Sequence, residues 1–453
     1  MSTAADILAE KRTQELVTLN QTLLEVTRNM AKALNRTQYY PPDRMRAYQR
    51  KLLEPLLHHA RKEVPFYANR LDPLFANDGS IRWEAWNNIP TFTRAEAQQA
   101  GDALYAKSVP EMAGSHKEHQ TSGSTGIPMK FRTSQIASLM NGAVGERIFE
   151  WHKIDLTGKM AFIVDTINRY PYPDGAMGQQ WNAVRPDAPA CELSLSASFE
   201  EQLEWLMATK PDILTAYPTV GTAICELAAQ RGISVPFHTF IGQGEVFNED
   251  SKTYLAQIHG LKLIDRYGAS EVGAIAAQCP SNNRYHQFCE ANLMEVLDFD
   301  SETFVKEGRG RLILTPFYNY AMPLIRYENQ DQIEITQAPC PCGCTLPSVT
   351  KILGRERHVF TYEDGSRSWP NLRKSEYSPF LPARQIQVIQ KTKTDIELRF
   401  VRESKDHTPI DREGLELFLR GRLHPSIQLE IVETEEILRA ASGKFENWVS
   451  LIN

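Results

Sequence analysis

The sequence has no excess of basic residues, and this argues against two broad classes of partner. Its 453 residues include 50 Lys and Arg against 56 Asp and Glu, which gives a formal net charge of −6. Proteins that bind nucleic acids or anionic membrane surfaces favour a basic face. We therefore expect neither a nucleic-acid partner nor a membrane partner.

Long apolar runs and a disulfide framework are also missing. No stretch reaches the roughly 18 apolar residues that a membrane-spanning helix needs, and residues 1–24 lack the apolar centre of a signal peptide. The seven cysteines are odd in number and spread through a long chain, unlike the paired cysteines of small secreted proteins. These absences predict a cytoplasmic protein.

The composition is that of a globular protein with an alternating pattern of helices and strands. Hydrophobic residues make up 42% and charged residues 23% of the chain, which is ordinary for a folded domain. Between residues 137 and 268, helix-like segments alternate with short apolar runs; these lie at 137–152, 160–164, 199–207, 212–218, 220–231, 239–245 and 261–268. Such alternation predicts a largely parallel sheet, whose ligands bind beyond the carboxyl ends of its strands.

The first part of the chain is predicted to be helical. Apolar residues recur at helical spacing over residues 1–36 and 43–63. We interpret residues 1–110 as a helical N-terminal extension. Its first helix is either a surface helix or an oligomerisation element, so a homodimer is one prediction.

A run of small residues at 121–126 has the composition of an anion-binding turn; it consists of Thr121, Ser122, Gly123, Ser124, Thr125 and Gly126. Glycines allow a sharp turn whose amides point inward, and the hydroxyls add donors. A phosphate chain is the natural ligand, and a solvated loop is the alternative. The P-loop of kinases and GTPases does not match, because no Lys-Ser or Lys-Thr follows Gly126.

Together with Pro128, this run resembles the phosphate loop of the adenylate-forming enzymes, which include acyl- and aryl-CoA ligases, adenylation domains and luciferases. Tyr267-Gly268-Ala269-Ser270-Glu271 resembles the superfamily's Tyr-Gly-x-[Ser/Thr]-Glu motif. A tyrosine ring can stack on adenine, and the Glu271 carboxylate is a suitable ligand for Mg²⁺. Residues 56–67 and 89–94 resemble the phenylacetate–CoA ligase branch in particular.

The resemblance implies a set of site residues. ATP or AMP would contact the loop at 121–126 and also Gly242, Gln243, Gly244, Glu245, Asp265, Arg266, Tyr267, Gly268, Ala269, Ser270, Asp331 and Arg355. Asp331 would accept hydrogen bonds from the ribose hydroxyls. The catalytic residues would be Lys444, which neutralises developing charge, Glu271, and His119, which orients the acyl carboxylate.

The resemblance also implies two domains and a fold class. Residues 1–354 would form a large α/β domain with mostly parallel sheets flanked by helices. Residues 355–453 would form a small, mobile α+β domain, joined at a hinge near Arg355. The segment after Arg355 departs from the superfamily pattern at Glu356-Arg357-His358, so the acceptor is less firmly indicated than the nucleotide.

A dense group of cysteines suggests a structural metal site. Cys340, Cys342 and Cys344 lie close together in the sequence, with Cys279 and His286 upstream. Thiolates and an imidazole can hold tetrahedral Zn²⁺, and some members of the branch look similar. We assign Cys279, His286, Cys340 and Cys342 as ligands, with Cys344 as the competitor and free buried thiols as the alternative.

The expected activity is therefore that of an AMP-forming acid–thiol ligase. ATP with Mg²⁺ would activate a carboxylic acid, aryl or aryl-acyl, to an acyl-adenylate, and coenzyme A would most simply accept the acyl group. A carrier-protein thiol or an amine is the alternative acceptor. A nucleotide-binding scaffold without turnover is the alternative of another class.

Overall fold

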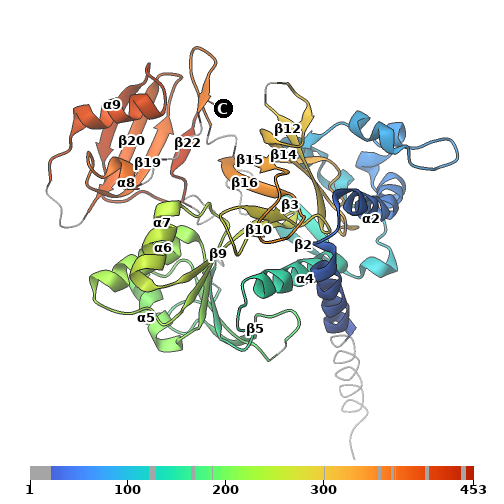
Figure 1. Ribbon diagram of the computed structural model, residues 1–453, viewed down its shortest axis with the longest axis horizontal. Coiled ribbons are helices and arrows are strands. Elements are labelled where there is room, and N and C mark those ends of the chain that lie inside the picture. The colour runs from blue at the N-terminus through green and yellow to red at the C-terminus, as the bar shows by residue number, and fades with distance from the viewer. Residues whose placement is uncertain are drawn as a thin grey trace, which may run out of the picture.

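The computed structural model describes residues 22–121, 129–164, 169–185, 187–299, 301–355, 359–368, 372, 374–403, 408–439 and 445–452. Figure 1 shows a large domain and, at one end, a smaller domain formed by the last part of the chain. The predicted fold class, a large α/β domain with a small separate C-terminal domain, is confirmed. Among the described helices, none is both long enough and apolar enough to cross a membrane.

A parallel group of strands forms one half of the main sheet. In spatial order these are β9 (Lys262–Ala269), β8 (Thr239–Gln243), β7 (Ile213–Ala216), β4 (Met160–Val164) and β6 (Pro189–Ser194), and β5 (Ala176–Gln180) is the antiparallel edge strand. The apolar run at 160–164 thus forms the strand that its composition predicts. Helices cover both faces of this strand, and burial on both faces explains its apolar composition.

Helices cover the two faces of these strands. The helices α5 (Phe199–Thr209), α6 (Pro218–Gln230) and α7 (Glu249–His259) pack on one face with residues such as Leu214 and Phe240. The helix α4 (Gln135–Trp151) packs on the other face with Ile213, Ile241 and Ile264. The helix α5 begins at a capping box in which Ser198 and Glu201 bond each other's backbone amides.

The other half of the sheet is mainly antiparallel, which the sequence pattern did not indicate. Its strands are β10 (Gly273–Gln278), β11 (Tyr285–Gln287), β16 (Ser348–Arg355), β15 (Tyr327–Thr336), β14 (Gly308–Pro316), β12 (Asn292–Asp298) and β13 (Phe304–Val305), and the short β1 (Phe92–Thr93) pairs with β15 in parallel. A separate hairpin, β2 (His116–Gln120) with β3 (Lys130–Ser134), flanks the glycine-rich segment.

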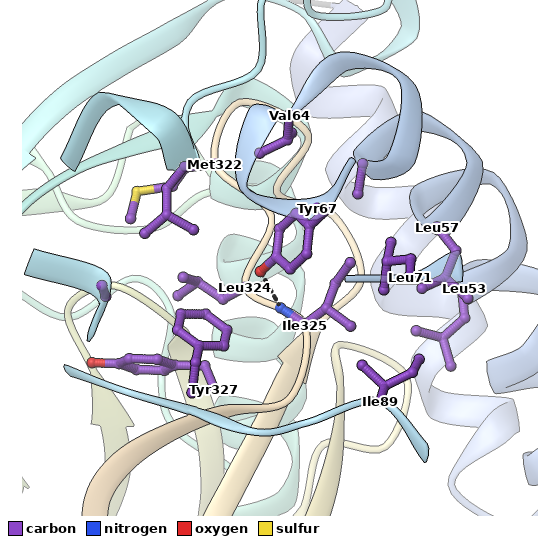
Figure 2. Packing of buried hydrophobic residues seen from close by; sticks show 14 of the residues in the cluster. Leu53, Leu57, Val64, Tyr67, Leu71, Ile89, Met322, Leu324, Ile325 and Tyr327 are labelled. Atoms are coloured by element: carbon purple, nitrogen blue, oxygen red, sulfur yellow. Dashed lines mark hydrogen bonds between the residues drawn. The ribbon is translucent and has the colours of Figure 1, made fainter. Parts of the chain in front are cut away.

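The N-terminal region is helical, as predicted, and covers the antiparallel half. It contains helical residues 22–37, α2 (Pro42–Glu63), α3 (Arg94–Ala100) and short 3₁₀ turns at Pro65–Tyr67, Asp72–Leu74, Trp83–Asn88, Gly101–Leu104 and Glu111–Ala113. Figure 2 shows how Leu53 and Leu57 of α2 pack near Leu71 and Tyr67. The Tyr67 hydroxyl accepts from the Ile325 amide at 2.9 Å and donates to the Pro323 carbonyl at 3.0 Å. These contacts fix the segment that leads into β15.

The C-terminal part has a core of its own. Its sheet has the order β21 (Gln428–Glu433), β20 (Asp395–Arg402), β19 (Ala383–Gln390) and β22 (Trp448–Ser450), with α9 (Arg412–Arg422), α8 (Lys374–Tyr377) and the pair β17 (Phe360–Thr361) and β18 (Arg367–Ser368). Phe360, Leu398 and Leu415 are fully buried in a cluster formed by this part alone. The boundary near residue 354 remains a prediction.

Candidate active site

A cavity of about 560 Å³ lies where β4, β7, β8 and β9 end at their carboxyl termini. In parallel sheets this edge is the usual ligand site. The described residues that line it are Arg94, Gln120, Thr121, Asn141, Ile148, Ile163, Val164, Ala216, Tyr217, Gln243, Gly244, Arg266, Tyr267, Gly268, Ala269, Ser270, Glu271, Gly273, Ala274, Ala276, Asn329 and Asp331. The structure therefore brings Thr121, Gln243, Arg266–Glu271 and Asp331 to a single cavity, although they are far apart in the sequence.

Asp331 and Tyr267 form one wall of this cavity. The Tyr267 hydroxyl donates to Asp331 Oδ2 at 2.7 Å, and Asn329 Nδ2 donates to the same oxygen at 2.8 Å. The two donors hold the carboxylate in one orientation. Gly268 follows Tyr267, and a Cβ there would lie 2.7 Å from the Gly273 carbonyl oxygen. Only glycine therefore allows β9 and β10 to approach so closely at the cavity.

Glu271 is held by a second network, and part of it was not expected from the sequence. The Tyr327 hydroxyl donates to Glu271 Oε1 at 3.0 Å, and Arg94 Nη1 lies 3.5 Å from the same oxygen. Burial, and then the nearby Glu271 carboxylate, raise the pKa of Tyr327, so its hydroxyl stays a donor. Arg94 also donates from Nη2 to Thr121 Oγ1 at 2.6 Å. Arg94 thus links the carboxylate to the start of the glycine-rich segment.

The two ends of that segment are fixed. Thr121 and Met129 form a backbone bond at 2.9 Å, and the Met129 amide donates to Thr121 Oγ1 at 2.9 Å. Among the predicted phosphate-loop residues, Ser122, Gly123, Ser124, Thr125 and Gly126 lie outside the described part of the chain, as does Lys444. The side chain of Arg355 is also outside it, although its backbone pairs with Asp331 across β15 and β16.

Several predicted residues do not line the cavity. The Asp265 carboxylate accepts from Tyr285 at 2.5 Å and lies 3.4 Å from Lys252 Nζ, and burial raises its pKa. Gly242 lies one residue before the lining residue Gln243. His119 is exposed on β2, where its ring stacks on Phe131 at 5.2 Å.

Glu245 also lies beyond the cavity, where it joins the two parts of the chain. One carboxylate oxygen, Oε2, accepts from Thr219 Oγ1 at 2.7 Å. The other, Oε1, accepts from the Phe445 amide at 2.7 Å and lies 3.5 Å from Arg439 Nη1. Phe445 directly follows Lys444 in the sequence. Glu245 therefore fixes the large domain to residues on both sides of the predicted catalytic lysine.

The four predicted metal ligands lie together. The ligand atoms of Cys279, His286, Cys340 and Cys342 are all within 4.8 Å of one another. His286 Nδ1 lies 3.2 Å from the Leu346 carbonyl, and Nε2 lies 3.2 Å from Cys342 Sγ. Such an arrangement, with Nδ1 bonded to a backbone carbonyl and Nε2 aimed at the ligand group, is typical of a metal-binding histidine. Burial lowers the pKa of His286, which keeps the ring neutral and able to coordinate.

Cys344 lies outside this group, with its Sγ 3.6 Å from the Gln38 carbonyl. It packs instead with Met45 and Cys289. The four-residue group joins the turn after β10 to the connection between β15 and β16, so a metal there would brace the antiparallel half of the sheet.

Asn141 and Asn329, like Arg94, line the cavity but were not expected from the sequence. Asn141 Oδ1 accepts from the Ala274 amide at 3.1 Å. Asn141 lies on a helix without a local motif, so only the packing of α4 on β10 brings it to the site. For Arg94 a signal existed, because it is the last residue of the segment 89–94, which resembles the phenylacetate–CoA ligase branch.

No protein-family model matches the chain, but individual proteins do. Phenylacetate–coenzyme A ligase of Thermus thermophilus is 25% identical over 335 residues, which cover 70% of this chain and 71% of the relative. The Aromatoleum evansii phenylacetate–coenzyme A ligase is 23% identical over 334 residues, covering 69% and 71%.

Solved structures show the same fold. A 2-hydroxyisobutyryl-CoA ligase in a postadenylation state superimposes with a TM-score of 0.72 at 17% identity and covers 91% of each chain. An anthranilate–CoA ligase bound to anthranoyl-AMP has a TM-score of 0.54 at 11% identity, covering 72% of this chain and 65% of that one.

The fold of this chain is therefore that of these solved CoA ligases, and its cavity lies at the carboxyl ends of the parallel strands. In sequence the chain is similar to phenylacetate–coenzyme A ligases, at 21–25% identity.

Proposed function

We propose that this protein uses ATP to convert a carboxylic acid to an acyl-adenylate and then transfers the acyl group to the thiol of coenzyme A. In the first step a carboxylate oxygen attacks the α-phosphorus and pyrophosphate leaves. In the second step a thiolate attacks the acyl carbon and AMP leaves. The single cavity lined by Thr121, Tyr267, Glu271 and Asp331 is the observation that supports this proposal best.

The chain's own residues mainly bind and orient the reactants. Asp331, fixed by Tyr267 and Asn329, is positioned to accept hydrogen bonds from ribose hydroxyls. Arg94 can neutralise phosphate charge at the end of the loop. Glu271 fits a Mg²⁺ site, because a carboxylate oxygen is a preferred ligand and its orientation is fixed by Tyr327. A bound Mg²⁺ would supply charge neutralisation on the phosphates.

The relatives' substrate supports the predicted acid class. Two of the similar proteins are phenylacetate–coenzyme A ligases, which favours an aryl or aryl-acyl acid here. Ile148, Ile163, Val164 and Ala216 give the cavity an apolar wall that suits such a group.

The test is pyrophosphate release with ATP, Mg²⁺ and a panel of carboxylic acids. We expect release that depends on the acid, an acyl-adenylate in the absence of coenzyme A, and a thioester in its presence, both identified by mass spectrometry. The Glu271→Gln variant should lower kcat about 100-fold or more, since it removes a group that acts on developing charge. The exposed Glu302→Gln is the matched control.

Two results would contradict the proposal. ATP binding without pyrophosphate release for any acid would favour the scaffold alternative. An adenylate that reacts with a carrier-protein thiol or an amine, and not with coenzyme A, would redirect the second step.

Size-exclusion chromatography of the same sample tests the predicted homodimer.

We also propose that Cys279, His286, Cys340 and Cys342 hold a structural Zn²⁺. The chemistry of the donor set and its compactness support this. Elemental analysis of the purified protein should find about one zinc per chain. Cys342→Ser should lose it, whereas Cys344→Ser should retain it, because Cys344 lies outside the group. Equal zinc loss in both variants would contradict the assignment.

A further inference from the structure

Arg266 differs from the other charged groups that line the cavity. These groups are Arg94, Arg266, Glu271 and Asp331. Arg94 pairs with Glu271 at 3.5 Å, and Asp331 accepts from Tyr267 at 2.7 Å. Among the described residues, Arg266 has neither an ion-pair nor a hydrogen-bond partner. Its neighbours across the sheet, Gln243 on β8 and Ala277 on β10, carry no charge.

The Arg266 side chain, which has no partner among the described residues, is half-buried at the cavity. Burial lowers the pKa of Arg266, and no acidic group among the described residues offsets this effect. A buried charge without a partner costs free energy unless an opposite charge joins it. A cation that is half-buried, lines a cavity and has no partner in the described part of the chain is suited to an anion supplied by the ligand.

The direction of Arg266 separates it from the nucleotide residues. Successive side chains of a strand point to opposite faces of the sheet. Ile264 packs with Val144 and Ile148 of α4, so Arg266, two residues later, lies on the α4 face. Tyr267 lies on the other face, where its hydroxyl reaches Asp331. Arg266 is therefore not placed to bind the ribose or the groups that Glu271 would bind.

The surroundings on the α4 face suit an acyl group. Phe162 packs in the same cluster as α4, so Val164, two residues later, shares the face of Arg266. Asn141 and Ile148 of α4 line the cavity as well. We call this group, formed by Asn141, Ile148, Val164, Gln243 and Arg266, the acid compartment. It combines apolar side chains, two amides and one cation that has no partner among the residues described.

We propose that the acid compartment selects a carboxylic acid with a second anionic group, a second carboxylate in the first instance, which Arg266 binds. The proposal rests on the proposed function and names the substrate class of that site. The first carboxylate would react at the phosphate, and the second would form paired hydrogen bonds with the guanidinium, a geometry in which arginine and carboxylate are complementary.

The experiment compares matched acids with and without the second carboxylate. Phenylacetate is compared with carboxyphenylacetate, and butyrate with succinate, by kcat/KM for pyrophosphate release. The wild type should prefer the diacid of at least one pair about a hundredfold or more. Arg266→Met, which keeps the length of the side chain without its charge, should remove that preference, and Arg266→Lys should restore part of it. Arg231→Met changes an exposed arginine at the C-terminal end of α6 that does not line the cavity, and this variant should behave as wild type.

The possible failures can be distinguished. If no acid gives pyrophosphate, the proposed function fails. If monoacids react as well as their diacids, or if Arg266→Met leaves the diacid preference unchanged, the proposed function stands and the role of Arg266 is refuted. Circular dichroism and thermal unfolding of Arg266→Met identify a loss of folding, and in that event Arg266→Lys with the matched acids decides the question. An Arg266→Met variant that folds normally but is inactive with every acid would also refute the role, because Arg266 would then act in a step that all the acids share.

Discussion

Removal of one partner of the buried Arg147–Glu290 ion pair should destabilise the large domain by about 3–5 kcal/mol. Both side chains are 0% exposed. Arg147 donates to Glu290 through two nitrogens, at 2.7 and 3.2 Å, and also to the Leu34 carbonyl at 2.6 Å. Thr37 donates to Glu290 from the same N-terminal helix. Glu290→Gln would therefore leave Arg147 charged in an enclosed site.

The magnitude follows from the completeness of burial. A charge left without its partner in a low-dielectric interior keeps its desolvation cost and loses the attraction that offset it. Because domains are stable by only about 5–15 kcal/mol, this loss is a large fraction of the total. The double variant Arg147→Met with Glu290→Leu removes both charges, so it should cost clearly less than the sum of the single changes.

Urea unfolding followed by tryptophan fluorescence measures the effect. Trp151 is a suitable reporter, since the Arg147 guanidinium lies 5.7 Å from its ring centre. The surface pair of exposed Arg309 and half-buried Glu334 provides the control, and its loss should change stability by about 1 kcal/mol or less. Single changes at the buried pair that cost under about 1 kcal/mol, or a double variant that costs the full sum, would refute this reasoning.

Three further predictions follow from other contacts. Asp331→Asn should raise KM for ATP about 10- to 100-fold, because it weakens charge-assisted hydrogen bonds to the ribose; an unchanged ATP KM in steady-state kinetics would contradict it. Glu245→Gln should slow pyrophosphate release more than thioester formation from added acyl-adenylate, because it loosens the contacts beside Lys444; equal slowing of both half-reactions would contradict that role. Burial raises the pKa of Glu146 to about 7, so the stability associated with its neutral form is present below pH 4.5 and lost as the pH rises to about 7. Glu146→Gln should thus raise the melting temperature at pH 8 and have little effect at pH 4. If the melting temperatures of the variant and the wild type differ by the same amount at both pH values, the prediction is wrong.

Four strands of the parallel half, β4, β7, β8 and β9, were readable from the sequence because each is a short apolar run, whereas β6 and the edge strand β5 were not predicted. The antiparallel half was not, since strands such as Tyr285–Gln287 and Phe304–Val305 are too short to show a period. The predicted N-terminal helix at 43–63 agrees closely with α2. Pro55 lies inside that helix, so a helix-breaking residue did not end it. Packing of Leu53, Leu56 and Leu57 in the core accounts for its persistence.

The motifs named several residues that line one cavity, but they could not assign a direction to each side chain. Asp265, Arg266 and Tyr267 are consecutive, and the resemblance assigned all three to the nucleotide. In the structure Asp265 is bonded to Tyr285, Tyr267 reaches Asp331, and Arg266 lies on the opposite face. A motif records which residue types are adjacent, whereas the pleat of the strand decides which compartment each one enters.

The alternation of side chains along β9 would separate the residues that bind the nucleotide from those that select the acid. Because Tyr267 and Arg266 lie on opposite faces of β9, the proposed nucleotide binding and acid selection would use neighbouring residues without sharing contacts. A substitution at Arg266 should therefore change the KM for the acid while the KM for ATP stays near its wild-type value. The reverse should hold for Asp331→Asn. Were the KM for ATP to rise together with that for the acid in Arg266→Met, the two compartments would be coupled, and the separation by strand faces would not describe this site.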